Sequence, residues 1–187
     1  MTDRSDLREA TQRALIGATI VGERVYTPLD WSTWDGEYPV LIVRAPSEEK
    51  TSLGRASVEF NVVATIQITG RIEIPADTAD IGALIAEEQL EALEREILRA
   101  VINFADLMAA LQQIAFVRSK AAFSSQGEQH LAELVLELGM EFYQGPEDFY
   151  QAAAVPLTEV RVNDPAVFAG GASDFPGLQA DITLPQS

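Results

Sequence analysis

The sequence predicts an α+β fold in which a mostly antiparallel sheet packs against a long helix and an N-terminal helix. Three observations predict it: strand-type alternation of apolar and polar residues over 58–74, helix-type spacing over 77–103, and a second alternation over 129–143. The sequence after this last segment is rich in Pro, Gly, Ala and Asp. We therefore expect a folded domain over residues 1–144 and an extended C-terminal arm over residues 145–187.

The composition is that of an acidic protein with an ample core. The chain has 187 residues, 47% of them apolar, and 29 acidic against 13 basic residues give a net charge of −16. Such a surface repels phosphates and anionic lipids, so gripping DNA or a membrane is not expected. Cysteine is absent, which excludes disulfides and thiol chemistry. The charged N-terminus and the lack of an apolar run of about 20 residues predict neither a signal peptide nor a membrane span.

The first elements are expected in a regular order. They are a helix over 6–16, a short strand over 24–27, a turn-rich loop over 28–36 that holds both tryptophans, and a strand over 39–45. Ser5 is the expected N-cap of the helix, and Gly17 is expected to end it. The strand over 39–45 is apolar on both faces in its middle, which predicts a central position in the sheet.

Residues 46–57 are polar and are predicted to form a loop. The loop joins two consecutive strands, so these strands are expected to pair antiparallel. Its length exceeds what a hairpin needs, and such loops are often functional. It is therefore either an ordinary surface loop or a contact with a neighbouring subunit or a partner. The charged residues that would make this contact are Glu48, Glu49, Lys50 and Arg55.

The segment over 58–74 alternates without interruption and is predicted to be a half-buried strand. Its apolar row consists of Val58, Phe60, Val62, Ala64, Ile66, Ile68, Gly70, Ile72 and Ile74. At about 3.3 Å per residue the strand would be roughly 55 Å long, whereas strands usually have about 5–6 residues. The strand is therefore expected either to bend at Gly70 or to project and require a partner.

The second half of the domain is expected to contain a long helix and a hairpin. The apolar stripe over 77–103 predicts the helix, and a second helical piece is expected over 104–113. Residues 114–123 and 129–143 are predicted to form a β-hairpin. In the arm, two short apolar segments, 158–162 and 181–185, are expected to pair with a sheet of this chain or of a neighbour.

No arrangement of residues predicts catalysis, cofactor binding or a metal site. His130 is the only histidine, and no serine signature accompanies it. Carboxylates at helical spacing, such as Glu87, Glu88 and Glu91, are expected to be solvated residues of an exposed helix face. Gly-rich phosphate-binding loops are absent from the sequence. The chain is therefore not expected to be an enzyme.

Glu133, Glu137 and Glu141 recur at every fourth residue of the strand over 129–143, so they should form a ladder on one face. The ladder is either a solvated outer face of the sheet or a negative surface that lines a ring or channel. In the second case, repulsion would let DNA slide past without adhering. The long helix would then lie on the opposite face, against Leu134, Leu136 and Leu138.

A group of residues in the first third of the chain carries a family resemblance. It consists of Arg24-Val25-Tyr26-Thr27-Pro28, Asp30-Trp31, Tyr38-Pro39-Val40-Leu41-Ile42-Val43, Ala45-Pro46, Lys50, Ser52-Leu53-Gly54-Arg55 and Phe60-Asn61-Val62-Val63-Ala64-Thr65. The pattern resembles tail terminator, or tail-completion, proteins of long-tailed bacteriophages and prophages. The expected order of elements over residues 5–143 is similar too.

The resemblance implies a structural virion protein that assembles as a ring, commonly of six subunits. Such a ring is assembled in the host cytoplasm, caps the finished tail tube, stops its polymerisation and joins it to the neck. The implied partners are further copies of the chain, the tail tube protein and a neck or head-completion protein. DNA would pass through the lumen without specific binding. The alternatives are another phage neck adaptor or tube protein and, in a different class, a cytoplasmic ligand-binding or enzymatic α+β domain.

Overall fold

The computed structural model describes residues 2–28, 37–55, 58–75, 82–126, 129–150, 159–162 and 180–183. The chain divides into two compact units, Met1–Phe149 and Tyr150–Ser187, which are described separately. The first unit thus extends slightly beyond the domain expected over 1–144. The loop with both tryptophans, most of the arm and the side chain of His130 lie outside the described residues.

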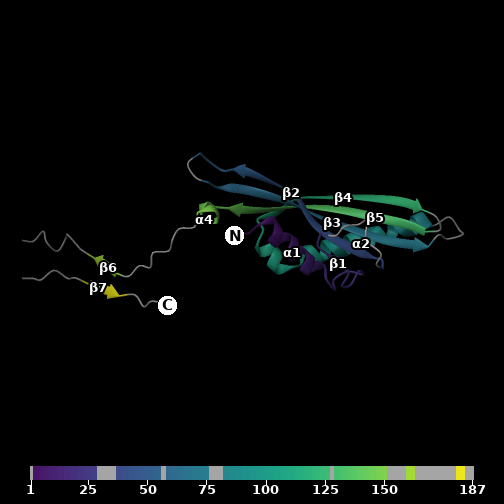
Figure 1. Cartoon of the computed structure of the whole chain (residues 1–187), viewed down its shortest axis with the longest axis horizontal. Coiled ribbons are helices and arrows are strands. Elements are labelled where there is room, and N and C mark those ends of the chain that lie inside the picture. The colour runs from purple at the N-terminus through teal and green to yellow at the C-terminus, as the bar shows by residue number, and fades with distance from the viewer. Residues whose placement is uncertain are drawn as a thin grey trace, which may run out of the picture. The chain divides into compact units, whose positions relative to one another are not determined.

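The first unit has an α+β fold, as predicted, with one mostly antiparallel sheet. Its elements are α1 (Arg4–Leu15), β1 (Val25–Tyr26), β2 (Val40–Ser52), β3 (Phe60–Pro75), α2 (Gly82–Ile102), α3 (Ala105–Ala109), β4 (Gln113–Gln126), β5 (Gln129–Gln144) and α4 (Pro146–Phe149). The strand order is β1-β2-β3-β5-β4, and only the short β1–β2 pair is parallel. Helices α1 and α2 lie on one side of this sheet (Figure 1).

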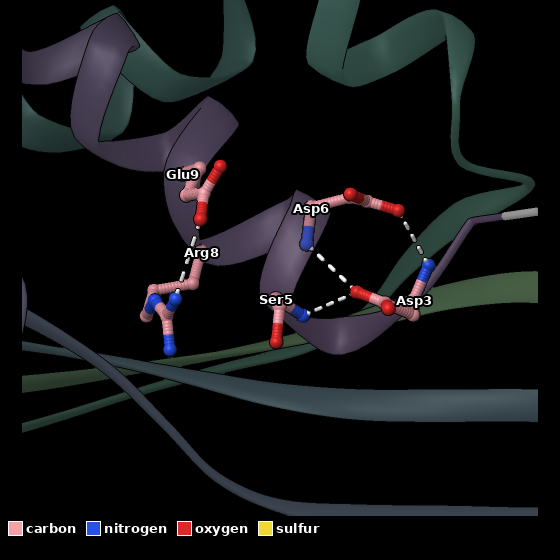
Figure 2. Close-up of polar contacts among 5 residues, drawn as sticks. All are labelled: Asp3, Ser5, Asp6, Arg8 and Glu9. Atoms are coloured by element: carbon pink, nitrogen blue, oxygen red, sulfur yellow. Dashed lines mark hydrogen bonds and ion pairs between the residues drawn. The ribbon is translucent and has the colours of Figure 1, made fainter.

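Helix α1 begins with a capping box, and the predicted N-cap is wrong by two positions. The Asp3 carboxylate accepts from the backbone N–H groups of Ser5 at 2.7 Å and Asp6 at 2.9 Å, and the Asp6 carboxylate accepts from the Asp3 N–H at 3.1 Å (Figure 2). Asp3 is the better cap because it satisfies two donors with a charge that the helix dipole favours. The helix ends as expected before Gly17, whose φ of 71° suits glycine.

The loop predicted over 46–57 is largely wrong, because β2 continues to Ser52. The pairing register shifts between Arg44 and Ser47, and residues 47–52 then pair with residues 60–65. This half of β2 is mostly exposed, so both of its faces can be polar and the alternation that marks a half-buried strand is missing. Pro46 sits at the register shift, where its missing N–H is tolerated.

Strand β3 confirms the long strand predicted over 58–74. It pairs with β5 along its whole length, from Phe60↔Gln144 to Pro75↔Gln129, and with β2 on its other edge. The long strand therefore has partners within its own chain. Gly70 allows close packing, since an added Cβ would lie 3.0 Å from Leu93 of α2 and 3.1 Å from Leu41 of β2.

The core fills the space between the sheet and the helices. Leu93 and Ile97 of α2 are fully buried in one cluster with Ile66 and Ile68 of β3. The cluster also includes Leu134, Leu136 and Leu138 of β5, and α2 packs on this strand. The prediction that the long helix covers this apolar face is thus confirmed for residues 82–102; its expected first turn lies outside the described residues.

The hairpin and the second helical piece differ from the predictions only in their bounds. Strands β4 and β5 form the predicted hairpin, and both extend a little beyond it. The helix expected over 104–113 shortens to α3, because the Gln112 N–H already donates to the carbonyl of Glu141 at 2.8 Å. Pairing with β5 therefore replaces the helix.

In the second unit, β6 (Glu159–Val162) and β7 (Ala180–Thr183) pair antiparallel, in the regions where short strands were expected.

Candidate functional site

The candidate site is the face of the sheet opposite the helices, which we call the polar face. Glu133, Glu137 and Glu141 of β5 lie on it, half-buried, while the intervening leucines point to the core. The register places these carboxylates opposite Arg71, Gln67 and Val63 of β3. The ladder expected from the sequence is therefore present on the face away from the helices.

Each carboxylate of the ladder is hydrogen-bonded by a side chain of a neighbouring strand. Arg71 Nε donates to Glu133 Oε2 at 2.5 Å, and Gln67 Nε2 donates to Glu137 Oε1 at 3.4 Å. Cross-strand pairs of this kind stabilise a sheet. The ladder is thus part of a polar network that connects β3 with β5.

Glu141 has the most complete set of partners. It accepts from Asn61 Nδ2 at 2.5 Å and from Gln113 Nε2 at 2.8 Å, which links β3, β5 and β4. These two hydrogen bonds, that of Asn61 first, lower the pKa of Glu141 against the opposing effect of desolvation. Glu141 is therefore ionised at neutral pH.

Four of the 13 basic residues of the chain also lie on the polar face, and sequence reasoning missed all of them except Arg71, which the alternation over 58–74 already places opposite the apolar row. They are Arg44, Arg71, Arg118 and Lys120. Arg44 and Arg118 share one register row with Gln67 and Glu137, and Lys120 lies opposite Val135. The alternation along β4 indicates that Arg118 and Lys120 share one face of the strand. Only the pairing register shows that these cations flank the carboxylate ladder. The polar face is thus not uniformly negative.

The end of the polar face near α4 is acidic. Tyr143 lies there, opposite Asn61. Partial burial, and then the nearby carboxylates of Glu59, Glu147 and Asp148, raise the pKa of Tyr143. Charge therefore varies along the strands, from a mixed region with cations to an acidic end.

The residues expected to contact a partner from loop 46–57 do not form one site. Lys50 Nζ donates to Gln144 Oε1 at 2.8 Å, lies 3.1 Å from Glu48 Oε1 and sits 5.8 Å from the centre of the Phe149 ring. Glu49 lies opposite Val63 on the polar face, and Arg55 is exposed beyond the end of β2. Lys50 and Glu48 are thus engaged within the chain, whereas Glu49 and Arg55 are accessible.

Gln144 and Phe149 are structural partners that the sequence did not reveal. Gln144 is 1% exposed and donates from Nε2 to the carbonyl of Thr2 at 3.1 Å, besides accepting from Lys50. The Phe149 ring packs edge-on against Phe60, with 5.8 Å between centroids. This cluster attaches α4 to the ends of β2, β3 and β5.

One hollow lies on the helix side, between α1 with the turn that follows it and the C-terminal end of α2. It has a volume of about 320 Å³ and is lined by Ala14, Ala18, Glu96, Arg99, Ala100, Asn103 and Phe104. The Glu96 carboxylate accepts from the backbone N–H of Ile20 at 2.8 Å, so it holds the turn that follows α1.

Within the described ranges, no group of three or more His, Cys, Asp and Glu side chains could hold a metal ion, and no helix could cross a membrane.

No protein-family model matches the chain, and no curated protein matches it significantly in sequence.

Proposed function

We propose that the chain is a structural virion protein that forms a ring on the tail tube of a long-tailed bacteriophage. The ring, of six subunits as in the family that the sequence resembles, would cap the tube, end its polymerisation and connect it to the neck. The partners would be further copies of the chain, the tube protein and a neck or head-completion protein. No cofactor is required. The order of helix, strands, long helix and hairpin agrees with this resemblance.

The observation that carries the proposal is that the sheet has two open edges. On one side, β4 pairs only with β5, so its outer edge from Gln113 to Gln126 has no neighbouring strand among the described residues. On the other side, β1 pairs only with Leu41 and Ile42, which leaves the rest of β2 similarly open. Open edges are templates for pairing with another chain.

The directions of the two edge strands, β2 and β4, are compatible with head-to-tail assembly. Strands β2, β3, β5 and β4 are joined by three antiparallel pairings, so β2 and β4 run in opposite directions. If β4 of one copy lies beside β2 of the next copy, the new pair is antiparallel like the rest of the sheet. A head-to-tail contact of this kind closes into a ring when its rotation closes.

Exposed apolar side chains at the β4 edge support the same contact. Val117 and Phe123 lie on the helix side of β4 and remain 47% and 52% exposed. A neighbouring copy would cover them. On β2, Pro46 has no N–H to donate, so the regular segment from Ser47 to Ser52 is the better acceptor of an incoming strand.

In such a ring, the polar face would form the lumen wall and the helices the outside. Glu133, Glu137 and Glu141 would then face the passing DNA. A neck adaptor or a tube protein could use the same edges, and they remain the nearest alternatives. The hollow of about 320 Å³ is the observation that favours a ligand-binding domain, the alternative of a different class.

Mass measurement in solution and negative-stain images test the proposal. The full chain, alone or with tube ends, is expected to form rings. Val117→Lys should prevent them, because a charge that points inward on an edge strand blocks pairing. Leu84→Lys is the matched control, because Leu84 is 57% exposed on α2, away from the edge. A compact monomer under both conditions, or equal loss of rings in the two variants, contradicts the proposal.

A further inference from the structure

A stacked arginine lies on the polar face, in the mixed region beside the carboxylate ladder. The Arg118 guanidinium carbon sits 4.3 Å from the centre of the Phe116 ring. Both residues belong to β4 and point to the same face, since they are two positions apart. Stacking on an aromatic ring restricts the guanidinium and is a favourable arrangement for arginine.

The ring of Phe116 can lie there only because its neighbour on β5 is a glycine. Gly139 is the register partner of Phe116, and an added Cβ at Gly139 would overlap the ring. The register also shifts between Ile114 and Phe116, which turns Phe116 onto the polar face. The Phe116 ring therefore lies over Gly139 of β5, and the Arg118 guanidinium stacks on this ring.

Lys120 adds a second cation on the same face, two residues along β4. Arg118 and Lys120 are both exposed, and no acidic residue occurs in β4. Among the described side chains, neither makes an ion pair. The nearest carboxylate by register, Glu137, accepts instead from Gln67. The two cations are therefore available to an external anion.

From these contacts we infer that Phe116, Arg118 and Lys120 form a contact site for the phosphate backbone of double-stranded DNA. A guanidinium with a restricted plane offers several donors to phosphate oxygens, and the ammonium adds a point charge. No base-reading group is involved, so the contact does not depend on sequence. The place where DNA meets the site rests on the ring proposed above; the chemistry of the contact does not.

The site changes what the polar face would do in a lumen. A surface with only carboxylates would repel DNA at every depth. With the stacked Arg118 and Lys120 beside Glu137 of the ladder, each subunit instead offers two exposed cations at one level of the wall, and the acidic end lies at another level. DNA would be held weakly at that level and repelled at the acidic end near Tyr143 and Glu141.

Fluorescence anisotropy of a short labelled duplex with the full chain tests the site at about 50 and about 200 mM salt. The wild type is expected to bind at the lower salt and to weaken at the higher. Arg118→Ala with Lys120→Ala should weaken binding on the order of tenfold and reduce the salt slope by about 1.8, since each phosphate contact contributes about 0.9. Phe116→Leu keeps both charges and should weaken binding less, because it removes only the stack.

The matched control is Arg13→Ala with Arg95→Ala, which removes two exposed cations from the helix layer. It should bind as the wild type does. No binding by the wild type at low salt, or an equal loss in this control, overturns the inference. The inference is also overturned if Arg118→Ala with Lys120→Ala changes the mass of the assembly but not DNA binding. That result would mean that the two cations contact carboxylates of a second copy. Rings without DNA binding would overturn the site alone, and binding without rings would overturn the ring alone.

Discussion

Leu136→Ala tests the assignment of the two faces of the sheet most directly. Leu136 is fully buried, lies opposite Ile68 of β3 and belongs to the cluster that packs under α2. The change removes three carbons, or about 2.4 kcal/mol at about 0.8 kcal/mol each. The cavity left in a rigid core raises the expected cost to about 3–5 kcal/mol. Val135→Ala, one residue earlier on the half-buried polar face, should cost about 1 kcal/mol or less.

Urea unfolding followed by far-UV circular dichroism measures both free energies, and equal m-values make them comparable. In thermal unfolding, Leu136→Ala should lower the Tm by roughly 10 °C, since 1 kcal/mol corresponds to about 2–4 °C at this chain length. Equal losses in the two variants, or a larger loss for Val135→Ala, would refute the reasoning. They would mean that β5 is shifted by one residue, which exchanges its two faces.

Three further predictions concern the network, the core and the root of the arm. Glu141→Gln should reduce stability at neutral pH, and this effect should disappear as the pH falls below about 4.5. The lowered pKa of Glu141 gives stability only while the carboxylate is ionised. A difference in stability between the variant and the wild type that persists in acid contradicts this. Ile66→Asp should abolish folding, judged by expression and circular dichroism, whereas Phe60→Asp should only lower the Tm, since Phe60 is partly buried at the end of its strand. Lys50→Glu should speed proteolytic cleavage after Phe149 without unfolding the sheet, and Glu49→Lys should not.

Alternation was enough to predict the centre of the sheet. Strand β3 and its partner β5 each have one face on the core and one polar face, so apolar and polar residues alternate along their sequences. The position of α2 over Leu136 and Leu138 followed, because only one face of the hairpin is apolar. A strand can be predicted from its sequence in this way when one of its faces is buried and the other is exposed.

The missed features depend on register or on distant contacts. The outer half of β2 is polar on both faces because it is mostly exposed, so no periodicity marks it. The cations beside the carboxylate ladder come from strands whose alignment with β5 is set by shifts at Arg44/Ser47 and Ile114/Phe116. Lys50 and Gln144 are 94 positions apart, and nothing in their local sequences relates them.

The buried amide of Gln144 has a practical consequence for where the first unit can be cut. Its two hydrogen bonds tie the chain start at Thr2 and the end of β2 at Lys50 to the last residue of β5. A chain shortened to the boundary expected from composition would leave a carboxylate beside this amide and remove the Phe149 ring from Phe60 and Lys50. Deletions intended to isolate the sheet should therefore retain α4, and fusions at the N-terminus should leave a flexible spacer before Thr2.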